Sequence, residues 1–182
     1  MIIKRKIGKA IFSTALAAVL GMAASAGAAG QTLTGAFDIG AAGNAQKFNP
    51  LTAPAGFSFY NKYFSTLTLY DVGLEKISGD LAESWTFAED GKSLTIHLRQ
   101  GVKWHDGRPF TATDVKFTLE LVKKPEMASV FSSRLKDVSA IRAVDAHTVA
   151  IDLVQMDASL PDAFTNLMIV PEHLLGKIPA KD

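Results

Sequence analysis

His105 and Asp106 are adjacent, and an imidazole beside a carboxylate is a combination that general acid–base catalysis uses. Both residues, however, lie in the sequence Trp104-His105-Asp106-Gly107, between a predicted strand and a predicted helix. An Asp-Gly pair at such a place is ordinary turn chemistry. We therefore interpret His105 and Asp106 as part of a turn and expect no catalytic role for them.

The other histidines and the serines do not indicate a metal site or a nucleophile either. The histidines show no i, i+4 spacing on a helix and no accompanying acidic cluster: His97, His105, His147 and His173. The serines considered lie in no nucleophile-elbow motif: Ser58, Ser84, Ser93 and Ser129. The sequence therefore predicts a binding protein with no catalytic residue, no metal and no cofactor.

A Gly-rich loop is the first candidate for ligand contact. Residues 31–39 alternate loosely in polarity and predict a buried strand, which ends at the loop 40–44. Open α/β sheets bind ligands at loops of this kind. The loop lacks phosphate-loop spacing and a Lys-Ser/Thr pair, which argues against a nucleotide site. After it, Asn49-Pro50-Leu51 and Pro54 predict an extended, turn-rich path.

The stretch 81–122 carries the clearest structural pattern, and the rest of the chain is organised around it. Trp85 and Phe87 precede a polar turn at 89–91, and apolar residues alternate over 94–98 after it. Because both apolar sets can face one core, the pattern predicts a hairpin.

A helix is predicted to follow this hairpin. Thr111 and Asp114 have the Ser/Thr-x-x-acid spacing of a helix N-terminus, and Pro125 is expected to stop the helix. Its apolar face comprises Val115, Phe117, Leu119, Leu121 and Val122.

Further elements are predicted from 125 to 175. Residues 125–136 read as a loop with a helical turn, and a second hairpin flanks Asp145-Ala146. A short helix over 160–167, a buried strand over 169–171 and a helix beginning at Pro171 follow. The apolar contacts expected of these segments are Met127, Val130, Phe131, Leu135, Val149, Ile151, Leu153, Phe164, Leu167 and Met168.

An aromatic segment runs from Phe57 to Tyr70. Phe57, Tyr60 and Phe64 share one helical face by their spacing, so we expect most of the aromatic residues here to pack in the core. The N-terminal end, with Phe57, Ser58 and Tyr60, directly follows the candidate loop and stays open as a ligand contact.

A family resemblance rests on motifs that recur in order over about forty positions. They are Leu81-Ala82-Glu83-Ser84-Trp85, Asp90-Gly91-Lys92, His97-Leu98-Arg99, Gly101-Val102-Lys103-Trp104-His105-Asp106-Gly107, Pro109-Phe110-Thr111-Ala112 and Asp114-Val115. Outside this region lie Asn49-Pro50-Leu51, Leu69-Tyr70-Asp71, Val144-Asp145 and Val170-Pro171-Glu172-His173. The chain resembles the family 5 extracellular solute-binding proteins, the peptide, oligopeptide and nickel receptors of ABC importers.

The resemblance implies an α/β, type 2 periplasmic-binding-protein fold. The expected architecture is an incomplete first lobe, a mixed sheet with flanking helices and hairpins, without the second lobe. The implied partners are a peptide or other small solute, held between two lobes, and transiently a membrane permease. The implied ligand-binding residues are Gly40, Ala41, Asn49, Phe57, Ser58 and Tyr60.

Composition and charge fit export and exclude nucleic-acid binding. Lys4, Arg5, Lys6 and Lys9 precede an apolar run from Ala10 to Ala23, which is shorter than the roughly 20 residues of a membrane span. We expect a signal peptide at 1–29, cleaved after Ala26 or Ala29, and a first-lobe portion at 30–182. Without the four early bases, 15 basic residues face 18 acidic ones, the opposite of a nucleic-acid binder.

The absence of cysteine leaves no residue for a lipid anchor or a disulfide, so we expect a freely soluble periplasmic protein. We also expect the full-length protein to be a monomer. The resemblance also predicts that the chain is the N-terminal part of a longer receptor. Two alternatives remain, a periplasmic interaction module that binds no solute and a secreted hydrolase.

Overall fold

The computed structural model describes residues 49–52 and 60–180, which all belong to one compact unit. The predictions for the signal peptide, for the strand over 31–39 and for Gly40 and Ala41 lie outside the described residues. The same holds for Phe57 and Ser58. The two predicted hairpins and the predicted helix lie within the described part of the chain.

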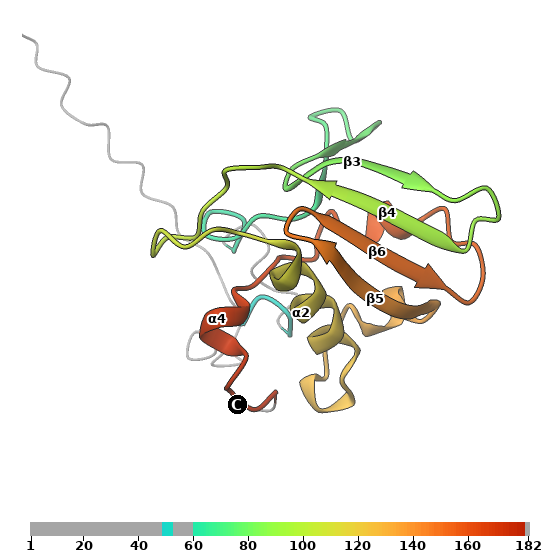
Figure 1. The fold of residues 1–182 in the computed structure, drawn as a ribbon. Coiled ribbons are helices and arrows are strands. Elements are labelled where there is room, and N and C mark those ends of the chain that lie inside the picture. The colour runs from blue at the N-terminus through green and yellow to red at the C-terminus, as the bar shows by residue number, and fades with distance from the viewer. Residues whose placement is uncertain (1–48, 53–59, 181–182) are drawn as a thin grey trace, which may run out of the picture. The chain divides into compact units, whose positions relative to one another are not determined.

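A four-stranded antiparallel sheet forms the centre of the unit (Figure 1), in the order β3-β4-β6-β5. Its strands are β3 (Ala82–Phe87), β4 (Ser93–Leu98), β5 (Val138–Asp145) and β6 (Thr148–Leu153). Trp85 pairs with Ile96 and Phe87 with Leu94, so the apolar residues of the first hairpin share a face. Both predicted hairpins are confirmed.

The irregularities of this sheet lie on its edge strands. In β3 the register shifts between Ala82 and Ser84, and in β5 it shifts between Val138 and Ala140 and between Ala143 and Asp145. In each case the edge strand carries one residue more than its partner, which is the arrangement of a β-bulge. The central pair β4 and β6 is regular throughout.

A second, two-stranded sheet consists of β1 (Thr68–Tyr70) and β2 (Ile77–Gly79), which form an antiparallel hairpin beside β3. Among the described residues every strand pair is antiparallel. The loop between β1 and β2 is organised by Asp71, whose carboxylate accepts hydrogen bonds from the backbone N–H groups of Glu75 and Lys76.

Helix α2 (Ala112–Lys123) packs against β5 and β6 and closes the core on one face of the sheet. Val115, Leu119 and Val122 are fully buried, as the 3.6-residue period of apolar positions predicts. The helix ends one residue before the Lys124-Pro125 pair, since proline cannot donate the backbone hydrogen bond that continuation requires. The predicted start, apolar face and end of this helix are confirmed.

Shorter elements complete the unit: η2 (Pro125–Met127), η3 (Ser132–Leu135), α3 (Leu160–Ala163) and α4 (Glu172–Leu175). The predicted helix over 160–167 is thus a single turn, and the predicted strand over 169–171 is wrong. That segment is buried, yet it forms no strand: the N–H of Ile169 donates to the carbonyl oxygen of Ser65 at 3.0 Å, next to an isolated bridge between Met168 and Thr66. Hydrogen bonds link Val170 to the hydroxyl of Thr118 instead, which ties the segment to α2 rather than to a sheet.

Most of the predicted core contacts are buried. The exceptions are Val130, which is 43% exposed, and two tyrosines of the aromatic segment. Tyr60 is buried and Phe64 is half-buried at the end of a helical turn, whereas Tyr63 is 50% exposed and Tyr70 lies on β1. Burial follows the helical spacing only as far as Phe64, because the chain leaves the helix there.

Asp114 joins three segments through one buried carboxylate, which is 4% exposed. Its Oδ2 accepts hydrogen bonds from the backbone N–H of Thr111 at 2.9 Å and from Nε1 of Trp104 at 3.3 Å. Its Oδ1 accepts a hydrogen bond from the backbone N–H of Glu172 at 2.9 Å. We call this set of contacts the Asp114 junction. The Asp side chain therefore does reach the N-cap residue, and it also connects α2 to the turn after Trp104 and to α4.

Replacing Asp114 by Ala would leave three N–H donors without their acceptor and remove one of the two hydrogen bonds of the capping box of α2. We expect Asp114→Ala to lower the free energy of unfolding by about 2–4 kcal/mol, measured by urea titration. The control is Glu120→Ala on the same helix, which removes an exposed ion pair to Lys116 and should cost less than about 0.5 kcal/mol. Equal losses in the two variants would contradict the role of the junction.

Gly79 on β2 approaches the chain where it turns into β3. A Cβ atom at this position would lie 2.0 Å from the carbonyl oxygen of Ala82, a backbone atom that cannot move aside alone. We expect Gly79→Ala to lower the free energy of unfolding by more than about 2 kcal/mol. The control is Gly101→Ala, where φ is +74° but nothing lies within 4 Å, and left-handed strain costs about 1 kcal/mol. Thermal unfolding of both variants tests the order; a larger loss for Gly101→Ala would refute it.

Candidate functional site

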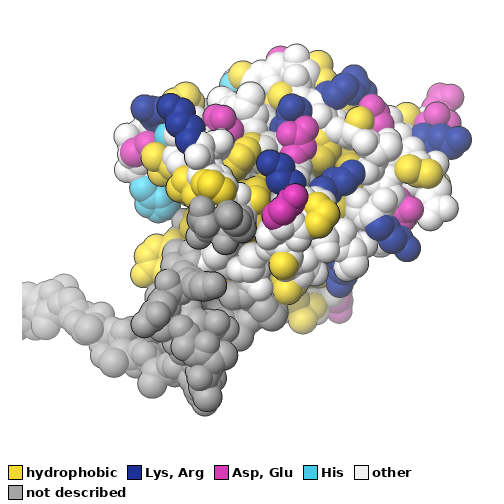
Figure 2. All heavy atoms as spheres, turned by 90° about the horizontal axis from the view of Figure 1, so that it is seen from below, with side chains coloured by type: hydrophobic (Ala, Val, Ile, Leu, Met, Phe, Trp, Pro, Cys, Tyr) yellow, Lys and Arg dark blue, Asp and Glu magenta, His cyan; other side chains and the backbone are white. Residues whose placement is uncertain are grey.

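A half-open hollow of about 910 Å³ lies beside α4 and the turn after Trp104. Segments far apart in the sequence form its wall: residues 49–52, 63–64, 104–106, 126–128, 170–171, 174–175 and 178–180, with Leu121 of α2. Figure 2, which shows the molecule from below, has hydrophobic side chains gathered next to histidine side chains. The volume is within the range of sites for small molecules, so this hollow is the candidate site.

The wall of the hollow is mainly apolar and aromatic. Leu51, Leu121 and Val170 belong to the buried core, whereas Leu174 and Ile178 are 59% and 50% exposed. Tyr63, Phe64 and Trp104 add aromatic rings. Such a wall favours apolar groups, since burying them removes their surface from water.

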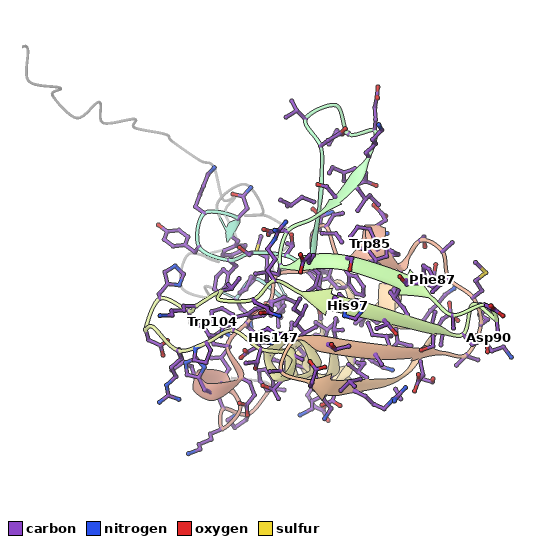
Figure 3. The ribbon with its side chains drawn as sticks, turned by 45° about the horizontal axis from the view of Figure 1, so that its top comes forward. Trp85, Phe87, Asp90, His97, Trp104 and His147 are labelled. Atoms are coloured by element: carbon purple, nitrogen blue, oxygen red, sulfur yellow. The ribbon has the colours of Figure 1, made fainter. Side chains whose placement is uncertain are left out.

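Trp104 is positioned by the turn that follows it (Figure 3). The N–H of Gly107 donates to the carbonyl oxygen of Trp104 at 2.9 Å, and Gly107 adopts a φ of +85°, which glycine tolerates without strain. The indole packs edge-on against Phe110, with the ring centroids 6.0 Å apart, and donates to Asp114. The predicted turn is confirmed, and it fixes the half-buried Trp104 ring at the hollow.

Asp106 and His173 form a contact across the hollow's edge that spans 67 residues of sequence. The Nε2 atom of His173 lies 2.7 Å from Oδ2 of Asp106. Asp106 also accepts a hydrogen bond from the backbone N–H of Arg108 at 3.1 Å. The hydrogen bond from this N–H has the largest effect on the pKa of the Asp106 carboxyl, and the hydrogen bond with His173 the next largest. Both hold that pKa below its usual range. The carboxylate thus stays charged and fastens the turn to α4.

The segment at Asn49 is shaped by one local hydrogen bond and anchored by another. The Oδ1 atom of Asn49 accepts from the backbone N–H of Leu51 at 2.9 Å, which forms a local turn. The buried hydroxyl of Ser129 donates to the carbonyl oxygen of Leu51 at 2.6 Å. Ser129 therefore anchors the segment to the loop after α2.

The structure places two of the predicted ligand-binding residues. Asn49 lines the hollow, whereas the buried Tyr60 is not among its lining residues. Gly40, Ala41, Phe57 and Ser58 lie outside the described residues, and the ligand contacts themselves stay a prediction. Trp104, Glu126 and Leu174 line the hollow but were missed. They come from three separate segments, so no local pattern marks them as neighbours.

Within residues 49–52 and 60–180, no group of three His, Cys, Asp or Glu side chains is arranged to hold a metal ion. The same part of the chain contains no helix with the length and apolar character that crossing a membrane requires.

Comparison with known proteins places the chain in a family. The family model described as "Bacterial extracellular solute-binding proteins, family 5 Middle" matches residues 76–182. A putative ABC transporter peptide-binding protein of Brucella ovis is 42% identical over 170 residues, which cover 93% of this chain and 32% of the relative. The chain thus spans about a third of the length of this curated relative.

Two solved structures are similar in fold. The oligopeptide-binding protein AppA of Bacillus subtilis, in complex with a nonapeptide, has a TM-score of 0.69 at 28% identity and covers 74% of this chain and 27% of its own. NikZ of Campylobacter jejuni, in complex with Ni(L-His), has a TM-score of 0.62 at 34% identity, over 66% of this chain and 24% of its own.

These similarities confirm the α/β class and the type 2 periplasmic-binding-protein fold, of which the described elements form a part. The family model covers more than half of the chain, and its match includes the four-stranded sheet, α2 and α4. The chain therefore belongs to the bacterial extracellular solute-binding proteins of family 5.

Proposed function

We propose that this chain is part of the solute-binding component of an ABC importer, which captures peptides or related solutes and delivers them to a membrane permease. The observation that carries the proposal is the 42% identity to the Brucella ovis putative ABC transporter peptide-binding protein, over 93% of this chain. Because the chain spans 32% of that relative, the proposal concerns the longer protein as well as this chain.

The proposed mechanism is closure of two lobes around the solute, followed by docking of the closed form on the permease. The chain supplies part of the first lobe, and the hollow supplies one apolar wall beside the Asn49 segment. An apolar and aromatic wall accepts many different side chains, since the hydrophobic effect is not directional. This tolerance suits a receptor for peptides of varied sequence.

We propose that the protein binds its solute without transforming it. The contact of Asp106 with His173 resembles the histidine–carboxylate part of a catalytic triad. However, the other carboxylate oxygen of Asp106 accepts a hydrogen bond from the backbone N–H of Arg108, within the same turn. This arrangement supports a structural role, in which the pair fastens α4 to the turn after Trp104.

Peptide binding is the direct test of the function. We expect a mixture of di-, tri- and oligopeptides to raise the midpoint of thermal unfolding of the chain, because a ligand that binds only the folded state adds about 2.7 kcal/mol at a concentration of 100 Kd. Maltose at the same concentration is the control and should leave the midpoint unchanged. Cooperative unfolding without any response to peptides would refute the proposal for this chain and favour the interaction module.

We also propose that the protein is periplasmic, exported by a signal peptide at 1–29, without a lipid anchor and monomeric when full length. The basic start, the apolar run from Ala10 to Ala23 and the absence of cysteine support this location. Intact-mass analysis of the protein from the periplasm is expected to give a first residue of Gly27 or Gly30, after cleavage at Ala26 or Ala29. A polypeptide that retains Met1 would contradict the signal peptide.

A further inference from the structure

We propose that the hollow is a subsite for a long cationic side chain, that of arginine or lysine, in a bound peptide. This inference rests on the proposed function and names the side chains that the hollow would select. It draws on the charges of the wall, on its apolar lining and on the way in which Glu126 is held.

The charge of the wall favours a cation. Asp106 and Glu126 are among the described residues that line the hollow, and none of those residues is Lys or Arg. Lys124 and Lys177 lie close to lining residues in the sequence, but neither contributes to the wall. The wall also contains the imidazole of His105, so a cationic group that enters the hollow meets two carboxylates and one histidine, but no lysine or arginine of the described wall.

The two carboxylates differ in what they already contact. Asp106 is engaged by His173 and by the backbone of Arg108, and the Arg108 guanidinium lies 3.9 Å from it. Glu126 is exposed, and it forms no ion pair with another residue of the described segments. Glu126 is thus the carboxylate that remains to bind a guanidinium or ammonium group.

The lining suits the rest of such a side chain. Arginine and lysine carry three or four methylene groups before the charge, which bury well along apolar surface while the charge stays near polar groups. Leu174 and Ile178 present exposed apolar surface on one part of the wall. Trp104 and Tyr63 add aromatic rings, whose faces attract cations.

Glu126 is held by a rigid turn. It lies in η2, where the N–H of Met127 donates to the carbonyl oxygen of Lys124 at 3.1 Å and that of Ala128 donates to Pro125 at 3.0 Å. The side chain of Met127 is buried below, and Pro125 fixes its own φ. The backbone of Glu126 is therefore already ordered, which lowers the entropy lost when a ligand binds.

The test compares Gly-Arg-Gly with Gly-citrulline-Gly, because citrulline has nearly the shape of arginine without its charge. Isothermal titration of the chain is expected to show the arginine peptide binding about 5- to 20-fold more tightly. In Glu126→Gln this preference should disappear, whereas in the control Glu120→Gln it should persist. Glu126 is exposed, so we expect both variants to unfold at the midpoint of the unsubstituted chain.

A fluorescence measurement locates the bound peptide. The chain has two tryptophans, and Trp85 lies on β3 well away from Trp104 (Figure 3). In Trp85→Phe, the emission of Trp104 should therefore shift when the arginine peptide is added.

Three results would overturn the inference. Equal affinity for the two peptides, or an arginine preference that survives in Glu126→Gln, refutes the subsite and leaves the proposed function intact. Failure of both peptides to bind a cooperatively unfolding chain refutes the subsite and the proposed function together for this chain.

Discussion

The buried carboxylate of Asp114 is the constraint on which the candidate site depends. A carboxylate that is removed from water needs donors, and here the donors come from three different segments: the residue before α2, the Trp104 indole and the first residue of α4. Because all three segments donate hydrogen bonds to the same carboxylate, the position of each one depends on the other two. The wall of the hollow is built from two of these segments, and its shape follows from the donors that Asp114 requires.

Helix α2 and the loop after it hold the segments that line the hollow. Thr118, one turn after Asp114, exchanges hydrogen bonds with the backbone of Val170 and holds the extended segment before α4. The loop after α2 holds the Asn49 segment through Ser129. The helix in turn is fixed on the sheet by its buried apolar face, so the sheet and α2 together form a rigid base beneath the hollow.

The sequence predicted the elements whose signals are local. Both hairpins and α2 have a clear period, a turn or cap and a stop signal within about ten residues, and their predictions are confirmed. The strand over 169–171 was wrong because an apolar run shows burial but does not show which group will satisfy its backbone. Of the described residues that line the hollow, the sequence predicts Asn49, because it belongs to a recognisable motif. Trp104 and Glu126 were missed, since only folding brings segments separated by tens of residues together.

The extra residues on the two edge strands affect how readily the sheet can associate with a strand of another molecule. Glu83 on β3, and Ser139 and Val144 on β5, interrupt the even spacing of the outward N–H and C=O groups. A straight strand from a neighbouring molecule would find its hydrogen bonds out of step at each of these residues. These irregularities therefore disfavour growth of the sheet by edge addition, the first step of ordered aggregation.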